Sequence, residues 1–547
     1  MDGRLIIRNE RLETAEKLVS ENPATLEPLG EVSLASQALC DRAVLAAKEA
    51  FPVWRDLATD VKREILKKAE RILAGRAAEA ARLVAAEKGS PYSESLAVEV
   101  FGSLQALGYY AENQGRLLRP HRAKHHVMLF YNKKSAFHFH ALGPTLVISP
   151  WNFPLLIPFC DVLSALTGGN TVVLRPSTTT PFTALFLGQV FVEAGLPPGV
   201  LNVVPCRVPQ AETMITHPGI QTVMFTGSVG VGKRIMELAS RNLTNLTLEL
   251  GGKDPMIVLE DADLERAARG AVWTAFMNCG QSCGSIERAY VDRRIVEPFM
   301  ARVVELAARV KVGNPLEPGV DMGPMANAGQ LKIVEEHLAD AKAKGARLLF
   351  GGRRLTTLPG YFVEPAVLDR VDHTMKIMTE ETFGPTLPIM PFDRLEEAVA
   401  LANDSRYGLT ASVWTRSRKR ASWFAERLEA GTVTVNDHMF SFVEPRAIWG
   451  GIKQTGMGRS HGPYGLHELV NIKYVSMDFL RRPSQTWWFP YDRGLERILE
   501  NTVAAYHGDG LGRRLGAVAA LRPEIGRIVK TSSIWNYARS LPRIFKP

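Results

Sequence analysis

Cysteine is scarce in this chain, with five among 547 residues. The five are scattered and odd in number, so they predict neither a disulfide framework nor a zinc site, and we expect a reducing compartment. Long apolar runs are also missing, because the most apolar stretch, 142–166, is interrupted by prolines, Asn152 and Asp161. The charged start, MDGRLIIRNERLE, lacks the apolar stretch of a signal peptide. These absences predict a large soluble protein of the cytoplasm without a metal site.

Positive charge is unevenly distributed. The formal net charge is +9, but residues 479–547 alone carry 12 basic and 5 acidic side chains. The rest of the chain is therefore almost neutral, whereas a nucleic-acid-binding body would be strongly basic. We expect no nucleic-acid partner, and the basic character belongs to a C-terminal extension.

Apolar residues indicate an α/β protein. Residues 36–118 have apolar positions at three- and four-residue spacing, which predicts helices. Strand-length apolar runs then occur at 145–149, 171–175, 201–205 and 222–227. Each interval between them fits one helix, an alternation typical of right-handed βαβ units in a doubly wound parallel sheet.

A second α/β set begins after Gly251. It consists of apolar runs at 255–260 and 287–292, helices over 296–310 and 329–344, and strands near Phe350 and Val367. We therefore expect a doubly wound parallel-sheet domain followed by a second α/β domain.

Three side chains stand where parallel α/β proteins place working groups. Cys283 lies in the small-residue loop NCGQSCGS, where backbone amides would lower the pKa of the thiol, although most lone cysteines are buried and inert. Glu249 ends an apolar run just before a glycine pair; the alternative is a surface carboxylate. Asn152 follows a strand in the stiff turn SPWNFP, where its amide could donate to an oxyanion or stabilise an Asx turn.

A glycine-rich stretch, FTGSVGVGK (225–233), follows a strand and opens a helix. Its spacing differs from the G-x-G-x-x-G fingerprint, so alone it indicates only a helix start that favours phosphate. Together with SPWNFP, LELGGK, GQSC, EETFGP and GGIKQTGMGR it follows the order and spacing of one family. From about residue 20 to about residue 478, the chain resembles an NAD(P)-dependent aldehyde dehydrogenase.

The resemblance implies a role for each of the three side chains. Cys283 would attack the aldehyde carbonyl to give a thiohemiacetal, and the Asn152 amide and the Cys283 backbone N–H would stabilise the oxyanion. Hydride transfer would leave a thioester, and Glu249 would activate the water that hydrolyses it.

The resemblance also implies NAD or NADP as the cofactor. The residues it places around the adenosine and pyrophosphate are Ile148, Trp151, Arg175, Thr178, Gly227, Ser228 and Val231. Glu381 and Phe383 would lie against the nicotinamide ribose and ring. Arg175 stands where the family usually has lysine, and Thr178 where NAD-preferring members often have glutamate, so both cofactors stay open.

The same resemblance predicts a homodimer or homotetramer with an oligomerisation arm. The expected segments are a cofactor-binding domain (1–119 and 143–250), a catalytic domain (251–449), bridging segments (120–142 and 450–483) and a C-terminal extension (484–547).

The sequence leaves open which aldehyde is the substrate and whether water or CoA accepts the acyl group. Aromatic side chains at Tyr109, Tyr110, Phe440, Phe442 and Trp449 would suit an apolar aldehyde or simply pack, whereas Arg446 and His438 would suit a carboxylated one. A CoA-acylating enzyme is one alternative, which the retained Glu249 disfavours because that branch generally lacks the base. A non-catalytic, membrane-docked binding protein is the other, and intact Cys283, Glu249 and Asn152 oppose it.

The C-terminal extension combines aromatic and basic residues. Its aromatic residues include Trp487, Trp488, Phe489, Trp535, Tyr537 and Phe545, interspersed with arginines. Such segments suit peripheral contact with an anionic membrane. Acidic residues lie between the arginines, so we expect instead a structural extension packed on the oligomer.

Overall fold

The computed structural model describes residues 2–125, 130, 132–479, 485, 487–489, 491–524 and 526. It divides into two compact units, which are described separately. Unit 1 comprises Met1–Leu117 and Ala141–Asn471, and unit 2 comprises Leu118–His140 and Ile472–Pro547. Each helix within the described ranges is too short or too polar to cross a bilayer.

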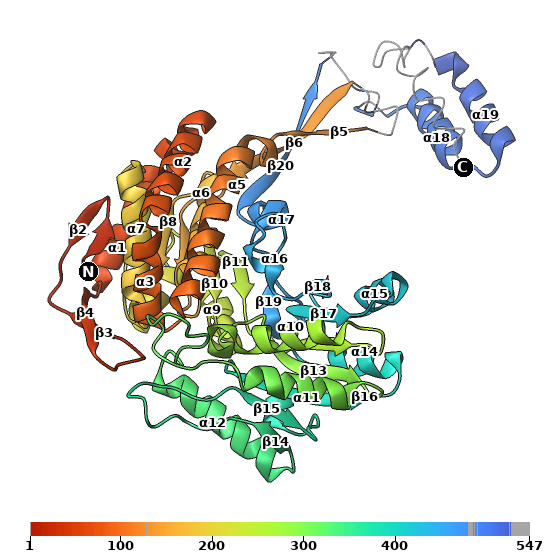
Figure 1. The fold of residues 1–547 in the computed structure, drawn as a ribbon. Helices are drawn as coiled ribbons and strands as arrows, with labels where there is room; N and C mark the ends of the chain where they lie inside the picture. Colours follow the sequence, from red (N-terminus) through yellow and green to blue (C-terminus); the bar gives the residue numbers. More distant parts are fainter. Residues whose placement is uncertain are drawn as a thin grey trace. The chain divides into compact units, whose positions relative to one another are not determined.

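The first sheet of unit 1 has the strand order β19-β11-β10-β7-β8-β9-β1-β2. Figure 1 shows its strands β8, β10 and β11 among the helices of the N-terminal half of the chain. The five strands from β11 to β9 are parallel, and the strands beyond them pair antiparallel. The bounds are β1 (Leu5–Ile7), β2 (Glu10–Leu12), β7 (Thr145–Ile148), β8 (Val172–Arg175), β9 (Leu201–Val203), β10 (Thr222–Thr226), β11 (Asn245–Glu249) and β19 (Gly456–Met457). The doubly wound parallel sheet expected from the apolar runs is confirmed.

Helices join and cover these strands. They are α1 (Gln37–Asp56), α2 (Thr59–Gly75), α3 (Ala77–Lys88), α4 (Tyr92–Glu94), the π-helix η1 (Ser95–Val100), α5 (Phe101–Leu117), α6 (Leu156–Thr167), α7 (Pro181–Ala194), α8 (Val208–Ile215) and α9 (Val229–Ala239). Every residue of α6 is buried, because it lies against β7, β8 and α5. A parallel sheet is covered on both faces, which explains the continuous apolar strands in the sequence.

The second sheet of unit 1 has the order β14-β15-β16-β13-β12-β17-β18 and is parallel except for β14. Its strands are β12 (Asp254–Val258), β13 (Ile286–Asp292), β14 (Arg347–Phe350), β15 (Ala366–Asp369), β16 (Thr386–Phe392), β17 (Thr410–Trp414) and β18 (Thr432–Val435). Its helices and turns are α10 (Leu264–Phe276), η3 (Met277–Gly280), α11 (Val296–Ala307), α12 (Ala328–Ala343), α13 (Lys376–Thr379), α14 (Leu395–Asn403) and α15 (Arg418–Ala425). After β18 come α16 (Phe440–Val443), η4 (Lys453–Thr455) and α17 (Gly462–His467), of which α16 contacts α5 and α17 contacts α6. The predicted second α/β set is therefore confirmed.

Sequence analysis did not predict the four strands at the N-terminus. β1 and β2 extend the first sheet, and β3 (Lys17–Glu21) pairs with β4 (Pro28–Ser33) in a separate hairpin. Strands of three residues such as β2 (ERL) are too short to show an alternating pattern.

Within the described residues, unit 2 has a three-stranded sheet and the two helices α18 and α19. The sheet has the order β20-β6-β5, with β5 (His121–Ala123), β6 (Lys133–Ala141) and β20 (Val470–Asp478). In the extension, α18 (Arg493–His507) packs on α19 (Leu511–Ala520), followed by a short turn, η5 (Arg522–Glu524). Trp535, Tyr537 and Phe545 of the predicted extension lie outside the described residues.

Candidate active site

One cavity of about 260 Å³ in unit 1 brings together most of the residues predicted from the motifs. The predicted residues that line it are Trp151, Asn152, Gly227, Ser228, Glu249, Cys283, Glu381 and Phe383. They come from loops at the carboxyl ends of β7, β10 and β11 and from two loops of the second sheet. The carboxyl ends of parallel strands are where α/β proteins bind ligands, so the topology gathers distant motifs here.

The loop before Cys283 has an unusual backbone. Asn278 and Cys279 both adopt the left-handed conformation, with φ of 56° and 55°. Such residues cost of order 1–3 kcal/mol each and persist only where neighbours hold them. The Asn278 side-chain amide donates to the carbonyls of Asn152 and Gln281, both at 2.9 Å, and Gln281 Nε2 donates back to Asn278 O at 3.0 Å. Asn278 and Gln281 were not among the predicted site residues.

Asn152 lies beside this loop and is buried. Its Nδ2 donates to the carbonyl of Gln281 at 3.3 Å, two residues before Cys283. The alternative of an isolated Asx turn does not describe this contact, since the amide reaches a second segment 129 residues away. A bond of this length is weak, so a better acceptor can compete for the donor.

Cys283 is half-buried, whereas the other four cysteines are buried. We expected backbone amides to lower the pKa of its thiol; the backbone N–H of Cys283 does lower it, but the net shift goes in the opposite direction. Burial raises the pKa of Cys283 well above its ordinary value, and the carboxyls of Glu381, Asp254 and Glu249 raise it further. The thiol therefore needs a base close by before it can act as a thiolate.

Glu249 ends β11, as predicted, and is 6% exposed. Within the described residues neither carboxylate oxygen makes a hydrogen bond of ordinary geometry. Space for the carboxylate comes from Gly450, where a Cβ would lie 2.6 Å from Glu249 Oε1. Burial raises the pKa of Glu249 well above its ordinary value, and Asp161 adds to that shift.

The loop with Glu381 and Phe383 forms the opposite wall. A Cβ on Gly251 would lie 2.5 Å from Glu381 Oε2, and the backbone N–H of Gly252 donates to Glu381 Oε1 at 2.9 Å. The pair of glycines in LELGGK therefore makes room for this carboxylate. Burial raises the pKa of Glu381 to about 8. Phe383 meets Trp151 edge to face, with ring centroids 5.5 Å apart.

Two buried charges that sequence analysis missed hold this loop. Lys253 and Glu287 form an ion pair of 2.5 Å, and both side chains are almost fully buried. Glu287 also accepts from the backbone N–H of Thr382 and of Phe383, at 2.8 and 2.9 Å. Lys253 directly follows the LELGG motif, so its position was visible, but its partner lies on another strand.

The other predicted cofactor residues lie at neighbouring strand ends outside the lining of this cavity. Ile148 and Arg175 are register partners at the ends of β7 and β8, and Thr178 follows in the next loop. Arg175 donates from Nη2 to the carbonyl of Cys206 at 3.0 Å, while its buried Nε makes no hydrogen bond within the described residues. Ser228 is the N-cap of α9, accepting from the backbone N–H of the exposed Val231.

The aromatic residues considered for the substrate divide into packed and exposed ones. Tyr110, Phe442 and Trp449 are buried, and the rings of Phe442 and Trp449 have centroids 4.8 Å apart. His438 is buried and its Nε2 donates to the carbonyl of Gly284 at 2.9 Å. Arg446 is exposed.

A half-buried thiol and a carboxylate that makes no hydrogen bond of ordinary geometry within the described residues share a cavity with the start of a helix. This arrangement is typical of an α/β oxidoreductase with a nucleotide cofactor.

The Aldehyde dehydrogenase family model matches residues 11–475. A 3-sulfolactaldehyde dehydrogenase of Pseudomonas putida is 36% identical over 471 residues, which cover 85% of this chain and 94% of that protein. The chain therefore belongs to the aldehyde dehydrogenase family, and it is an NAD(P)-dependent aldehyde dehydrogenase.

Solved structures agree with this assignment. An NADP-dependent enzyme of E. coli is 33% identical with a TM-score of 0.84, covering 87% of this chain and 98% of that one. An NAD+ complex of the aldehyde dehydrogenase from Bacillus cereus is 34% identical with a TM-score of 0.84, covering 88% and 97%. The family match ends before the C-terminal extension.

Proposed function

We propose that the chain oxidises an aldehyde to the carboxylic acid through a thiohemiacetal and a thioester on Cys283, followed by hydrolysis with water activated by Glu249. The observation that carries the proposal is the state of Glu249: a buried carboxylate that makes no hydrogen bond of ordinary geometry within the described residues, in the same cavity as the only half-buried thiol. A carboxylate in this state can accept a proton from water, as hydrolysis requires.

Thiohemiacetal formation needs a thiolate at Cys283. Because burial and three neighbouring carboxyls oppose a negative charge there, the thiol keeps its proton until the carbonyl is in place. This proton passes to solvent water as the substrate binds, so Glu249, which faces the same cavity, stays ionised for the later hydrolysis. The sulfur then bonds to the carbonyl carbon, and the electron pair of the carbonyl moves to oxygen.

The Asn152 amide stabilises that oxyanion together with the Cys283 backbone N–H. Asn152 Nδ2 is a donor on a buried side chain, and its existing bond to the Gln281 carbonyl is long, so little is lost when it turns to a charged oxygen. In the last step water attacks the thioester while Glu249 takes one of its protons. The C–S bond then breaks with its electron pair on sulfur, the acid is released, and Glu249 returns the proton to the Cys283 thiolate.

The residues of the cavity fit a nicotinamide dinucleotide. Gly227 and Ser228 precede the 11-residue helix α9, whose first backbone N–H groups favour a pyrophosphate. Glu381 and Phe383 would hold the nicotinamide ribose and ring, and the partnerless Nε of Arg175 suits an adenosine-side oxygen. When bound, the nicotinamide accepts hydride. Both NAD and NADP remain candidates, because Thr178 leaves this end without a carboxylate.

We further propose a homodimer or homotetramer that acts in the cytoplasm on a small aldehyde. Residues 120–142 and 450–483 would form its bridging arm, with the cofactor domain at 1–119 and 143–250 and the catalytic domain at 251–449. The extension, 484–547, would be a structural element, and peripheral membrane contact is the competing role.

Replacement of the nucleophile tests the proposed function. The Cys283→Ala variant should lose aldehyde-dependent NAD(P)H formation while its melting temperature and cofactor affinity stay unchanged, because no covalent intermediate can form. Cys279→Ala is the matched control and should leave most of the activity, since this thiol is buried in the core and its hydrogen bond goes to Met325 Sδ at 3.4 Å. An aldehyde panel with and without CoA separates hydrolysis from acyl transfer. Normal turnover by Cys283→Ala would show that another group is the nucleophile.

A further inference from the structure

A buried lysine lies next to the catalytic loop without any role in the chemistry proposed above. Lys88 is the last residue of α3, and none of its side chain is exposed. Its Nζ makes no hydrogen bond within the part of the chain that the structure describes. A buried ammonium in this state is costly unless opposite charges are close.

Two glutamates act on Lys88 through their charge, although neither forms an ion pair of 4.0 Å or less with it within the described residues. Glu94 and Glu99 both act on Lys88 electrostatically and oppose the effect of burial, which lowers the pKa of its ammonium. Burial likewise raises the pKa of Glu99, and Lys88 opposes that shift. Lys88 therefore favours the ionised form of both carboxyls.

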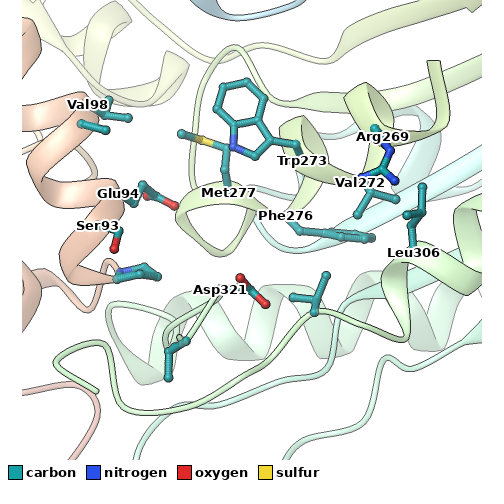
Figure 2. Close-up of a pocket in the computed structure, with 14 residues that line it drawn as sticks. Ser93, Glu94, Val98, Arg269, Val272, Trp273, Phe276, Met277, Leu306 and Asp321 are labelled. Carbon is teal, nitrogen blue, oxygen red and sulfur yellow. The ribbon is translucent and has the colours of Figure 1, made fainter. Parts of the chain in front are cut away.

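Glu94 holds the loop of the nucleophile. Its Oε2 accepts from the backbone N–H of Asn278 at 2.9 Å, the first of the two left-handed residues before Cys283. Figure 2 shows Glu94 directed toward the turn that carries Met277, in a cavity of about 520 Å³ that Trp273 and Phe276 also line.

Glu99 holds the loop of the oxyanion donor. It is 1% exposed and belongs to the π-helix η1, a kind of distortion that is frequent at functional sites. Its Oε2 accepts from the backbone N–H groups of Leu155 and Leu156 at 3.0 and 2.7 Å, where α6 starts directly after the Asn152 turn.

We infer that Lys88 is a positioning residue: through Glu94 and Glu99 it holds the Cys283 loop and the Asn152 loop in the relative positions that the oxyanion requires. An ionised carboxylate accepts backbone hydrogen bonds more strongly than a neutral carboxyl. Without the ammonium, the two glutamates would favour their neutral forms, and the left-handed turn at Asn278 would lose a strong acceptor. The inference rests on the proposed roles of Cys283 and Asn152.

The test compares Lys88→Met with Lys62→Met, a matched buried lysine. Lys62 is 6% exposed and donates to the Arg55 carbonyl, away from the site, so its loss costs stability alone. We expect Lys88→Met to lower kcat and the burst rate of NADH formation about 10- to 100-fold, the effect of a small misplacement of reacting groups. Its KM for aldehyde and its cofactor affinity should stay within about twofold, because neither depends on the oxyanion.

Two further measurements test the inference in other ways. The first does not depend on turnover, and the second uses a variant other than Lys88→Met. Iodoacetamide should alkylate Cys283 several times faster in Lys88→Met than in Lys62→Met, because the loop around the thiol relaxes. Glu94→Gln should also lower kcat, and adding Lys88→Met to it should lower kcat by a smaller factor than in the wild type, since the two act in series. The new amide of Glu94→Gln faces the cavity and can reach water.

The outcomes separate this inference from the proposed function. If Lys88→Met matches Lys62→Met in kcat, burst and alkylation, Lys88 has no positioning role even though Cys283→Ala is inactive. If Lys88→Met does not fold, Glu94→Gln decides: unchanged kcat and unchanged alkylation overturn the inference. An active Cys283→Ala variant would instead refute the mechanism on which both rest.

Discussion

Glu287 and Glu249 are two buried glutamates on opposite sides of the candidate active site, with 2% and 6% exposure. Glu287 has a partner for each oxygen: the Lys253 ammonium, the Thr382 N–H and the Phe383 N–H. Glu249 has none of ordinary geometry within the described residues, and Gly450 leaves its carboxylate free space.

The difference teaches that burial alone does not identify a working carboxylate. A carboxylate whose hydrogen-bonding capacity is filled by the chain fixes a loop in place, whereas one left without partners is available to water or substrate. By this criterion Glu287 holds a loop in place, whereas Glu249 takes part in the reaction. The substitutions below test this difference.

The largest effect on turnover should come from Glu249→Gln. The amide cannot accept a proton from water, so hydrolysis of the thioester should slow by roughly 10²–10⁴-fold, the usual contribution of a general base. Stopped-flow absorbance should still show a burst of NAD(P)H. Absence of both a burst and a rate loss would remove Glu249 from the mechanism.

The pH dependence of the wild type gives an independent measurement for the same residue. Because burial raises the pKa of Glu249, the ionised base is lost as the pH falls through that raised value. The rate of the steady state, which follows the burst, should therefore decline toward acid pH at a higher pH than an ordinary carboxyl would give. Glu249→Gln should lack this decline.

A smaller effect on turnover, but a larger one on stability, is expected for Glu287→Gln. This change leaves the Lys253 ammonium buried without its counter-charge, which typically costs about 3–5 kcal/mol. Denaturant unfolding should show that loss, while kcat should fall less than tenfold and the ratio of the burst rate to the steady-state rate should stay close to that of the wild type. A Glu287→Gln variant with normal stability and a hydrolysis defect would reverse the comparison.

Sequence patterns predicted the parts of the fold that are set by local periodicity. The parallel strands β7, β8, β9 and β10 form at the apolar runs, because a buried strand needs a continuous apolar stretch. The motifs also placed Asn152, Glu249 and Cys283 correctly enough to meet at one cavity. The motifs do not predict which residue forms a hydrogen bond or an ion pair with each of these side chains.

The missing part of the site consists of contacts between distant segments. Glu287 and Lys253 are 34 residues apart, and Lys253 and Thr382 are 129 apart. The sign of the Cys283 pKa shift was mispredicted for the same reason, since it depends on burial and on three carboxyls brought in by other loops. Burial and these electrostatic interactions arise only after the chain has folded.

Unlike the sites of Glu287 and Glu249, the adenosine end of the predicted cofactor site has no carboxylate. Thr178→Glu adds one beside Arg175, and it should accept from the free ribose hydroxyls of NAD and repel a 2′-phosphate. We expect the ratio of kcat/KM for NAD over NADP to rise about tenfold, which corresponds to about 1.4 kcal/mol. Thr179→Glu is the neighbouring control, and an unchanged ratio in Thr178→Glu would contradict the assignment.

We expect the smallest effect on turnover from truncation of the extension. In this segment, side chains that contact other residues of unit 2 again lie next to side chains that are exposed. Gln485 accepts from Asn132 at 2.9 Å and Trp487 meets the ring of Phe130 at 5.3 Å, whereas Trp488 and Phe489 are 51% and 79% exposed. The partnered groups indicate a structural role, because they bind the start of the extension to the sheet of unit 2.

Two truncations separate these groups. Deletion of residues 484–547 should lower the melting temperature by a few degrees or dissociate the oligomer, since it removes both Gln485 and Trp487. Deletion of residues 492–547 keeps both and should cost less, while kcat per site changes little in either. Differential scanning fluorimetry and light scattering measure these effects, and sedimentation with anionic liposomes tests the competing role. If the full-length protein binds such liposomes in a salt-sensitive way and both truncations melt at the wild-type temperature, the extension is a membrane contact rather than a structural element.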